Sequence, residues 1–135
     1  MNHAPFDNAA RAGVYYLAGG QLPDIVANVL PVDLAGLKTL RGALRRLGAQ
    51  LEFPDWYGGN LDALNDCLSD PDWLGVQGKV VLIRGLASLQ AADPEGCATL
   101  LEVFLAAADD CRGSGSPLWI LIDHPAKGIA RLPSA

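Results

Sequence analysis

Asp62 and Asp66 are the residues of this chain whose type and spacing could support acid–base chemistry. On a helix they would stand one turn apart, about 6 Å from each other, which is within reach of the carboxylate separations of glycosidases. Such catalysis needs different surroundings for the two groups, so that one is protonated while the other is charged. Neighbouring positions on one exposed helix face give matching surroundings. The spacing therefore favours binding, and a small α/β hydrolase that uses this pair is the alternative.

The other reactive groups give no convincing catalytic or metal-binding arrangement. The spacing of the nearby acids (Asp62, Asp66, Asp70, Asp72) fits no EF-hand loop, and no histidine is close in sequence to complete a zinc site. Gly58 and Gly59 before a helix start could bind an anion through backbone N–H groups, but six surrounding acids oppose this and a Walker lysine is absent. Cys67 could meet His124, yet it falls beside an apolar stripe and should point inward. We expect no catalytic residue, metal or cofactor.

Negative charge is concentrated in one segment of the sequence. Six acids and no Lys or Arg lie between Gln50 and Gly78, whereas nine acids and ten bases occupy the rest of the chain. The same segment carries Trp56, Tyr57 and Trp73, which places apolar rings beside unpaired negative charge. This composition suits a basic protein partner. The acidic pI of about 4.7 argues against nucleic acid or an anionic membrane as partner.

The acidic segment is predicted to be a loop followed by a helix. Pro54 and the two glycines interrupt regular structure, and Asn60 is a good N-cap for a helix that starts there. Leu61, Leu64 and Leu68 would form its buried stripe, leaving the carboxylates on another face. Trp56 and Tyr57 either both cover the sheet edge or leave one ring exposed, and the sequence does not decide between these. Trp73 follows a predicted turn that could leave it exposed.

The remaining patterns predict one α/β domain with a small, mainly parallel sheet of three to four strands flanked by helices. Continuous apolar runs at Val80–Ile83 and Leu118–Ile122 are typical of neighbouring parallel strands, joined by one helix from Pro94 to near Gly113. A strand is expected at Val29–Leu34, with Pro31 tolerated at a sheet edge. A helix capped by Thr39 follows, with solvated arginines. VYYL at 14–17 favours a further strand, and residues 22–28 favour a short helix.

Length and composition bound the organisation of the chain. We divide its 135 residues into an N-terminal extension (1–28), an α/β domain (29–122) and a C-terminal tail (123–135). Three cysteines are an odd number, and two of them lie about 21 Å apart on one predicted helix, so all three should be reduced thiols. No signal or membrane segment is recognised at the N-terminus. We expect a cytoplasmic protein.

Residues 53–68, FPDWYGGNLDALNDCL, resemble the central segment of the barstar-like ribonuclease inhibitors. Members of that family are intracellular inhibitors of barnase-type ribonucleases with a small parallel sheet flanked by helices. The order of elements predicted here is similar over roughly residues 29–122. The resemblance thus implies a barstar-like fold, a basic ribonuclease or related toxin as partner, and a protein that is monomeric when free.

The resemblance also implies which residues bind the partner. In the family, the loop and helix enter the nuclease active site, where helix aspartates stand in for RNA phosphate. The matching positions here are Trp56, Gly58, Asn60, Asp62, Asn65, Asp66 and Trp73. Two positions depart from the family: Asn65 stands where barstar has a tryptophan, and Ala106 falls about where it has a contacting glutamate. A different basic protein therefore remains an alternative partner.

Overall fold

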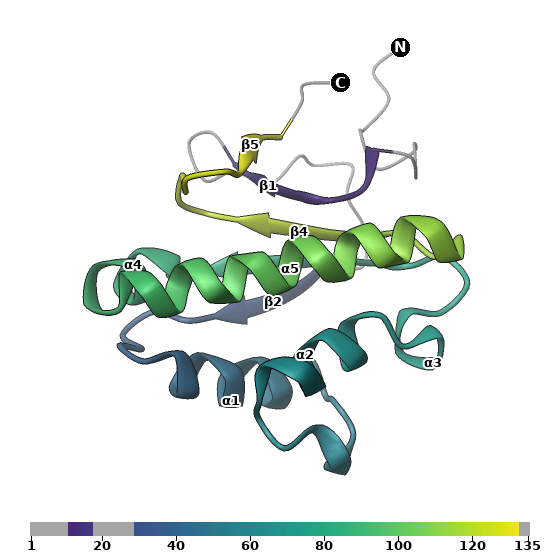
Figure 1. Cartoon of the computed structure of the whole chain (residues 1–135), viewed down its shortest axis with the longest axis horizontal. Helices are drawn as coiled ribbons and strands as arrows, with labels where there is room; N and C mark the ends of the chain where they lie inside the picture. Colours follow the sequence, from purple (N-terminus) through teal and green to yellow (C-terminus); the bar gives the residue numbers. More distant parts are fainter. Residues whose placement is uncertain (1–10, 18–28, 133–135) are drawn as a thin grey trace.

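A computed structural model of the chain describes residues 11–17 and 29–132, and Figure 1 shows how their strands and helices are arranged. The five strands are β1 (Val14–Tyr16), β2 (Val29–Asp33), β3 (Lys79–Arg84), β4 (Leu118–Ile122) and β5 (Ala130–Arg131). The helices are α1 (Leu40–Gln50), α2 (Leu61–Leu68), α3 (Pro71–Leu74), α4 (Leu86–Ala92) and α5 (Pro94–Ser114), with a 3-10 turn, η4 (Asp55–Tyr57). The predicted α/β class is confirmed.

The strands form one parallel sheet in the order β2-β3-β4-β1-β5. The predicted parallel pairing of β3 with β4 is confirmed, with Val81 opposite Ile120 and Ile83 opposite Ile122. Pro31 is exposed on β2, the edge strand, where its missing N–H breaks no ladder. The expected count of three to four strands was too low by one, because the two-residue β5 adds a fifth strand beside β1.

Helix α5 crosses the sheet, and α1, α2 and α3 lie below it in the view of Figure 1. Alternate strand residues such as Val81, Ile83 and Ile120 join these helices in the main core. The intervening residues Leu82 and Leu121 form a smaller cluster on the other sheet face. The core therefore supports α2 from within, and only one side of that helix is left to solvent.

The connection from β3 to β4 contains two helices rather than the one predicted. Helix α4 starts directly after Gly85, whose φ of 75° puts that residue in the left-handed region. The backbone N–H of Gly85 donates to the Asp123 carboxylate at 2.8 Å. Helix α5 begins after Asp93, which accepts a hydrogen bond from Gly96 N–H at 2.9 Å. The break at Asp93–Pro94 separates the two helices, since proline has no N–H to continue α4.

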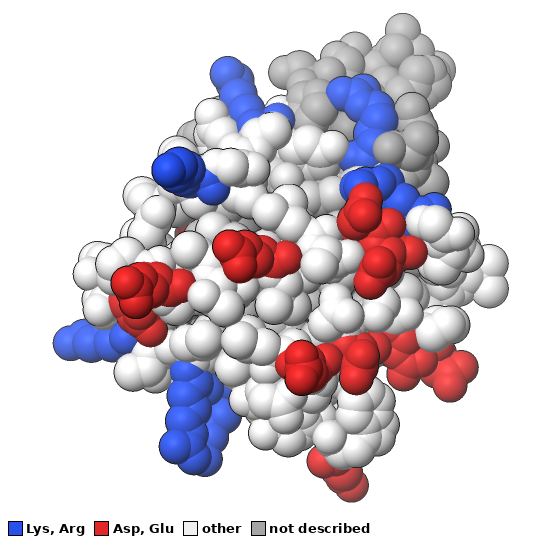
Figure 2. All heavy atoms as spheres, viewed as in Figure 1, with Lys and Arg blue, Asp and Glu red and all other residues white. Residues whose placement is uncertain are grey.

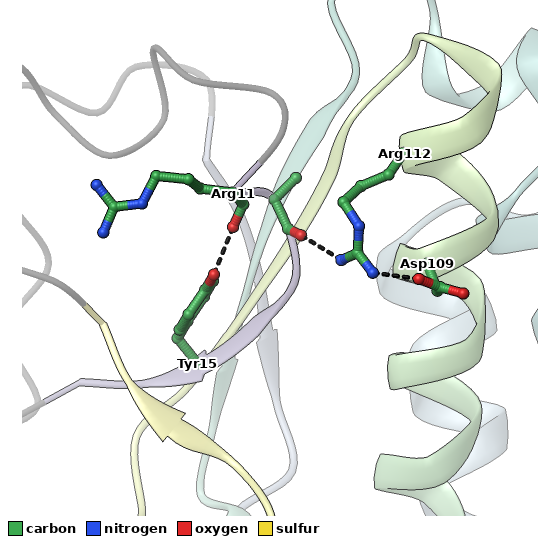
Figure 3. Close-up of polar contacts among 5 residues, drawn as sticks. Arg11, Tyr15, Asp109 and Arg112 are labelled. Atoms are coloured by element: carbon green, nitrogen blue, oxygen red, sulfur yellow. Dashed lines mark hydrogen bonds and ion pairs between the residues drawn. The ribbon is translucent and has the colours of Figure 1, made fainter.

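The start of β1 is fastened to α5 by one arginine (Figure 3). Arg112 donates from Nη1 to the carbonyl oxygen of Ala12 at 2.6 Å and from Nη2 to Asp109. Tyr15 donates its hydroxyl to the carbonyl oxygen of Arg11. The strand expected at residues 14–17 thus forms as β1. The short helix expected at residues 22–28 lies outside the described residues, as do residues 1–10 of the N-terminal extension.

Candidate functional site

Helix α2 starts where the sequence predicts and carries the two carboxylates outward. Asn60 is the N-cap, and its Oδ1 accepts a hydrogen bond from Ala63 N–H at 2.8 Å. The inner stripe of the helix (Ala63, Leu64, Cys67, Leu68) is buried. Asp62 and Asp66 are exposed, and neither forms a hydrogen bond or ion pair with any residue described by the structure. Figure 2 shows acidic side chains gathered in a row over α2 and α3.

The loop before α2 leaves helix α1 through a sharp, hydrogen-bonded turn. Glu52 has a φ of 56°, which is uncommon for a residue with a side chain. Phe53 N–H then donates back to the carbonyl oxygen of Gly48 at 3.0 Å, as in a Schellman motif. This turn directs Phe53 inward and the following residues outward.

Three aromatic rings anchor the loop to the body of the protein. Tyr57 is 7% exposed, and its hydroxyl donates to the carbonyl oxygen of Leu44 at 2.8 Å. The Phe53 ring lies 5.0 Å from the Tyr57 ring and 5.4 Å from the Trp73 ring, between centroids. Trp73 Nε1 donates to the carbonyl oxygen of Leu51 at 3.0 Å. These contacts join the end of α1, the loop and α3 into one unit.

Trp56 is left outside this aromatic cluster. Its side chain is 57% exposed, although η4 fixes the backbone around it. Gly58 and Gly59, with φ values of 65° and 69°, then turn the chain into Asn60. An exposed tryptophan and two unpaired carboxylates are thus presented by adjacent, firmly held segments. Such a surface can bind a partner that supplies cations and an apolar contact.

The structure differs from expectation at Trp73 and adds detail at two other positions. Trp73 does not follow an open turn: it lies in α3, is only partly exposed, and is held by Leu51 and Phe53. Asn65 is partly buried, and its Oδ1 is enclosed without a hydrogen-bond partner. Ala106 is exposed on α5. The sequence left open whether one or both of Trp56 and Tyr57 are buried, and in the structure only Tyr57 is buried.

The buried thiols are poorly suited to nucleophilic catalysis. Cys67, Cys97 and Cys111 are all free and buried, as predicted. Burial raises the pKa of Cys67 from 9.0 to about 11, with further contributions from the charges of Asp70 and Asp66. A thiol with such a pKa is almost entirely protonated near neutral pH. Within the described parts of the chain, no three His, Cys, Asp or Glu side chains lie close enough to hold a metal ion.

Sequence reasoning missed the residues that hold the loop. An ideal Cβ on Gly48 would stand 2.5 Å from the Tyr57 ring, so only glycine lets α1 and this ring pack together. A glycine inside a predicted amphipathic helix was the available signal, because it destabilises a helix unless close approach is needed. Glu52 in the left-handed region gave no signal, since sequence preferences predict glycine or asparagine there.

Comparisons with known proteins agree with this geometry. None of the described helices is long and apolar enough to cross a membrane. A comparison with curated protein sequences gives no match. A family model described as Barstar (barnase inhibitor) matches residues 27–123, which include the whole of α1, the loop, α2 and the strands β2 to β4. Since this match covers well over half of the chain, the protein belongs to the Barstar (barnase inhibitor) family.

Proposed function

We propose that this protein inhibits a basic ribonuclease of the barnase type by covering the active site of the nuclease with α2 and the Trp56 loop (residues 51–60). The observation that carries the proposal is the pair Asp62 and Asp66, exposed and unpaired beside an exposed tryptophan. Like charges one turn apart destabilise a helix by about 0.2–0.5 kcal/mol, so the fold itself gains nothing from the pair. A cationic partner gives both carboxylates a role.

In the proposed complex, the two carboxylates occupy the positions of RNA phosphates. Ribonuclease active sites bind phosphate through Arg, Lys and His side chains, which pair equally well with aspartate. Trp56 would bury its exposed ring against the nuclease, while Gly58 and Asn60 let the loop approach closely. Trp73 would act indirectly, by holding the loop through Phe53. Asn65 lies on the same helix, but its amide oxygen is enclosed, so we assign it a minor part.

The hydrolase alternative receives no support from the geometry. Asp62 and Asp66 share one exposed helix face, and neither lines the hollows at α1, α3 or α5. Acid–base catalysis requires one carboxyl group to be desolvated relative to the other. We therefore expect the purified protein to show no hydrolysis of RNA, glycosides or phosphate esters. Turnover that disappears in Asp62→Asn would restore the enzyme hypothesis.

The direct test is titration of a purified barnase-type ribonuclease with this protein, with RNA cleavage as the readout. We expect stoichiometric inhibition that weakens with salt, because the docking surface is charged. Asp66→Ala should weaken binding by about 2–5 kcal/mol, mainly through faster dissociation, as in known nuclease–inhibitor complexes of this family.

Asp72→Ala is the matched control for the Asp66 variant. Asp72 is also exposed, but it lies in α3, beyond the helix proposed to enter the active site. Its removal should change mainly the association rate and the salt dependence. If the ribonuclease binds Asp66→Ala as tightly as the wild type, α2 is not the docking helix. If instead a different basic protein is captured and ribonucleases are not, the partner assignment is wrong.

A further inference from the structure

A basic hollow opens on the other side of the Trp56 loop from the acidic helix. Its volume is about 400 Å³, and its walls come from α1 and from the loop before α2. Arg41 and Arg45 line it from α1, while Phe53, Tyr57 and Asp55 line it from the loop. Figure 2 shows basic side chains gathered below the sheet at α1, beside the acidic row over α2 and α3.

The two arginines of this hollow have no structural role in the described fold. Both are exposed, and neither forms a hydrogen bond or ion pair with a described residue. Their neighbour Arg46 is different, because its Nη1 donates to the carbonyl oxygen of Asp33 at 2.8 Å. Asp55 is the one acid in the lining and forms no ion pair with either arginine. The lining thus has a net positive charge, and no residue in the described part of the chain pairs with its two guanidinium groups.

The hollow adjoins any interface that uses both α2 and the loop before it. A stable protein–protein interface buries about 800 Å² on each partner, contributed by about 20–30 residues. The eight residues of α2 and the short loop are too few to supply this area, so the partner must extend further. Gly58 and Gly59 line the hollow and lead directly into α2, so a partner that extends from α2 over the loop reaches the hollow at α1.

Resting on the proposed function, we propose that this hollow receives an acidic side chain or short acidic loop of the same ribonuclease. The partner would then be dipolar, with its basic active site over Asp62 and Asp66 and a carboxylate between Arg41 and Arg45. A partner that is basic throughout would desolvate two guanidinium groups against like charge, which opposes binding strongly. Arginine binds carboxylates in a bidentate manner, and the rings of Phe53 and Tyr57 limit access of water to such a pair. The hollow would thereby select among basic nucleases.

The test compares two charge-reversed double variants against one purified barnase-type ribonuclease. Arg41→Glu/Arg45→Glu changes the hollow, and Arg84→Glu/Arg131→Glu makes the same change in net charge at two exposed arginines of β3 and β5. The control should associate at least as fast as the wild type, because a more acidic inhibitor attracts a basic nuclease more strongly. The hollow variant should dissociate at least tenfold faster than the control. The dissociation rate of Arg41→Lys/Arg45→Lys, which keeps the charge, should lie between those of the wild type and the hollow variant.

Several outcomes would overturn the inference. A hollow variant that binds as tightly as the control would show that no carboxylate of the nuclease meets the arginines, while inhibition by the wild type would leave the proposed function intact. Absence of inhibition by the wild type would remove the proposed function and this inference with it. Retention of short RNA by the wild type but not by the hollow variant would assign the hollow to nucleic acid. Dimers in sedimentation that dissociate in the hollow variant would assign it to a second copy of the chain.

Discussion

Gly48→Ala tests how the binding loop is held, because it adds one methyl group where α1 meets Tyr57. The new Cβ would stand 2.5 Å from Cε2 and 2.6 Å from Cδ2 of the ring. Carbon atoms pack at about 3.5–4.0 Å, so the ring must move by about 1 Å. Tyr57 is buried and its hydroxyl is bound to Leu44, so such a movement breaks this hydrogen bond and displaces the loop.

The expected effect of Gly48→Ala on the free energy of unfolding is the sum of one stabilising and two destabilising contributions. Alanine stabilises a helix interior by about 0.5–1 kcal/mol relative to glycine. Overpacking against the ring costs about 1–3 kcal/mol, and loss of a buried hydrogen bond costs about 1 kcal/mol more. The net effect is a decrease in the free energy of unfolding of about 1–3 kcal/mol. Binding of the ribonuclease should weaken as well, because Trp56 and Gly58 adjoin the displaced ring.

Urea denaturation measures the free energy of unfolding, and Gly113→Ala is the matched control. Gly113 lies in α5, and a Cβ there would meet nothing within 4 Å, so alanine should stabilise the protein. In a Tyr57→Ala background the clash is absent, and Gly48→Ala should become stabilising too. If Gly48→Ala stabilises the otherwise unchanged protein as Gly113→Ala does, the proposed packing of the loop on α1 is refuted.

Three further predictions concern buried groups. Asn65→Leu removes an enclosed, unpaired amide oxygen and should raise the free energy of unfolding by about 1 kcal/mol in urea denaturation, whereas Asn65→Asp should lower it. Burial raises the pKa of Cys67 and of Cys111 from 9.0 to about 11, and that of Tyr57 from 10.0 to about 12. Because the unfolded chain loses these protons first, stability should be fully present below pH 9 and decrease from pH 9 to 12, by about 2–3 kcal/mol per group; a flat profile in alkaline urea titrations would contradict this. Thiol titration should find three reactive groups in the denatured protein and slow reaction in the native protein, and fewer than three would show a disulfide.

Much of the fold could be predicted because its signals are local and strong. The apolar residues of β3 and β4 are continuous, whereas a half-exposed strand alternates apolar and polar residues. They therefore indicated parallel strands buried on both faces. Asn60 and Thr39 were identified as N-caps, and both side chains accept a hydrogen bond from the first helical turn. Strand β5 was not predicted, because it has only two residues, both exposed, and so short a segment has no detectable hydrophobic period. Helix α4 was missed because no side chain caps it.

The site was harder to predict than the fold, because its geometry depends on tertiary contacts. The outward direction of Asp62 and Asp66 followed from the leucine stripe alone. The inward direction of Phe53 and Tyr57 depends on the turn at Glu52 and on the space above Gly48, which no periodic pattern encodes. The indole N–H of Trp73 donates a hydrogen bond to the carbonyl oxygen of Leu51, twenty-two positions earlier in the chain. Ring burial in a loop is therefore decided by partners that are distant in sequence.

The aromatic anchor would also help a loop with two left-handed glycines to bind the proposed partner tightly. Immobilising a free side chain at an interface costs about 0.5–1.5 kcal/mol, and ordering a free backbone costs more. Here η4, the Phe53 and Tyr57 contacts and the Asn60 cap fix the backbone on both sides of Trp56 before any partner arrives. Only the indole ring and the two aspartate side chains remain to be ordered. A variant that loosens the anchor, such as Tyr57→Ala, should therefore weaken binding although Tyr57 is itself buried away from the partner.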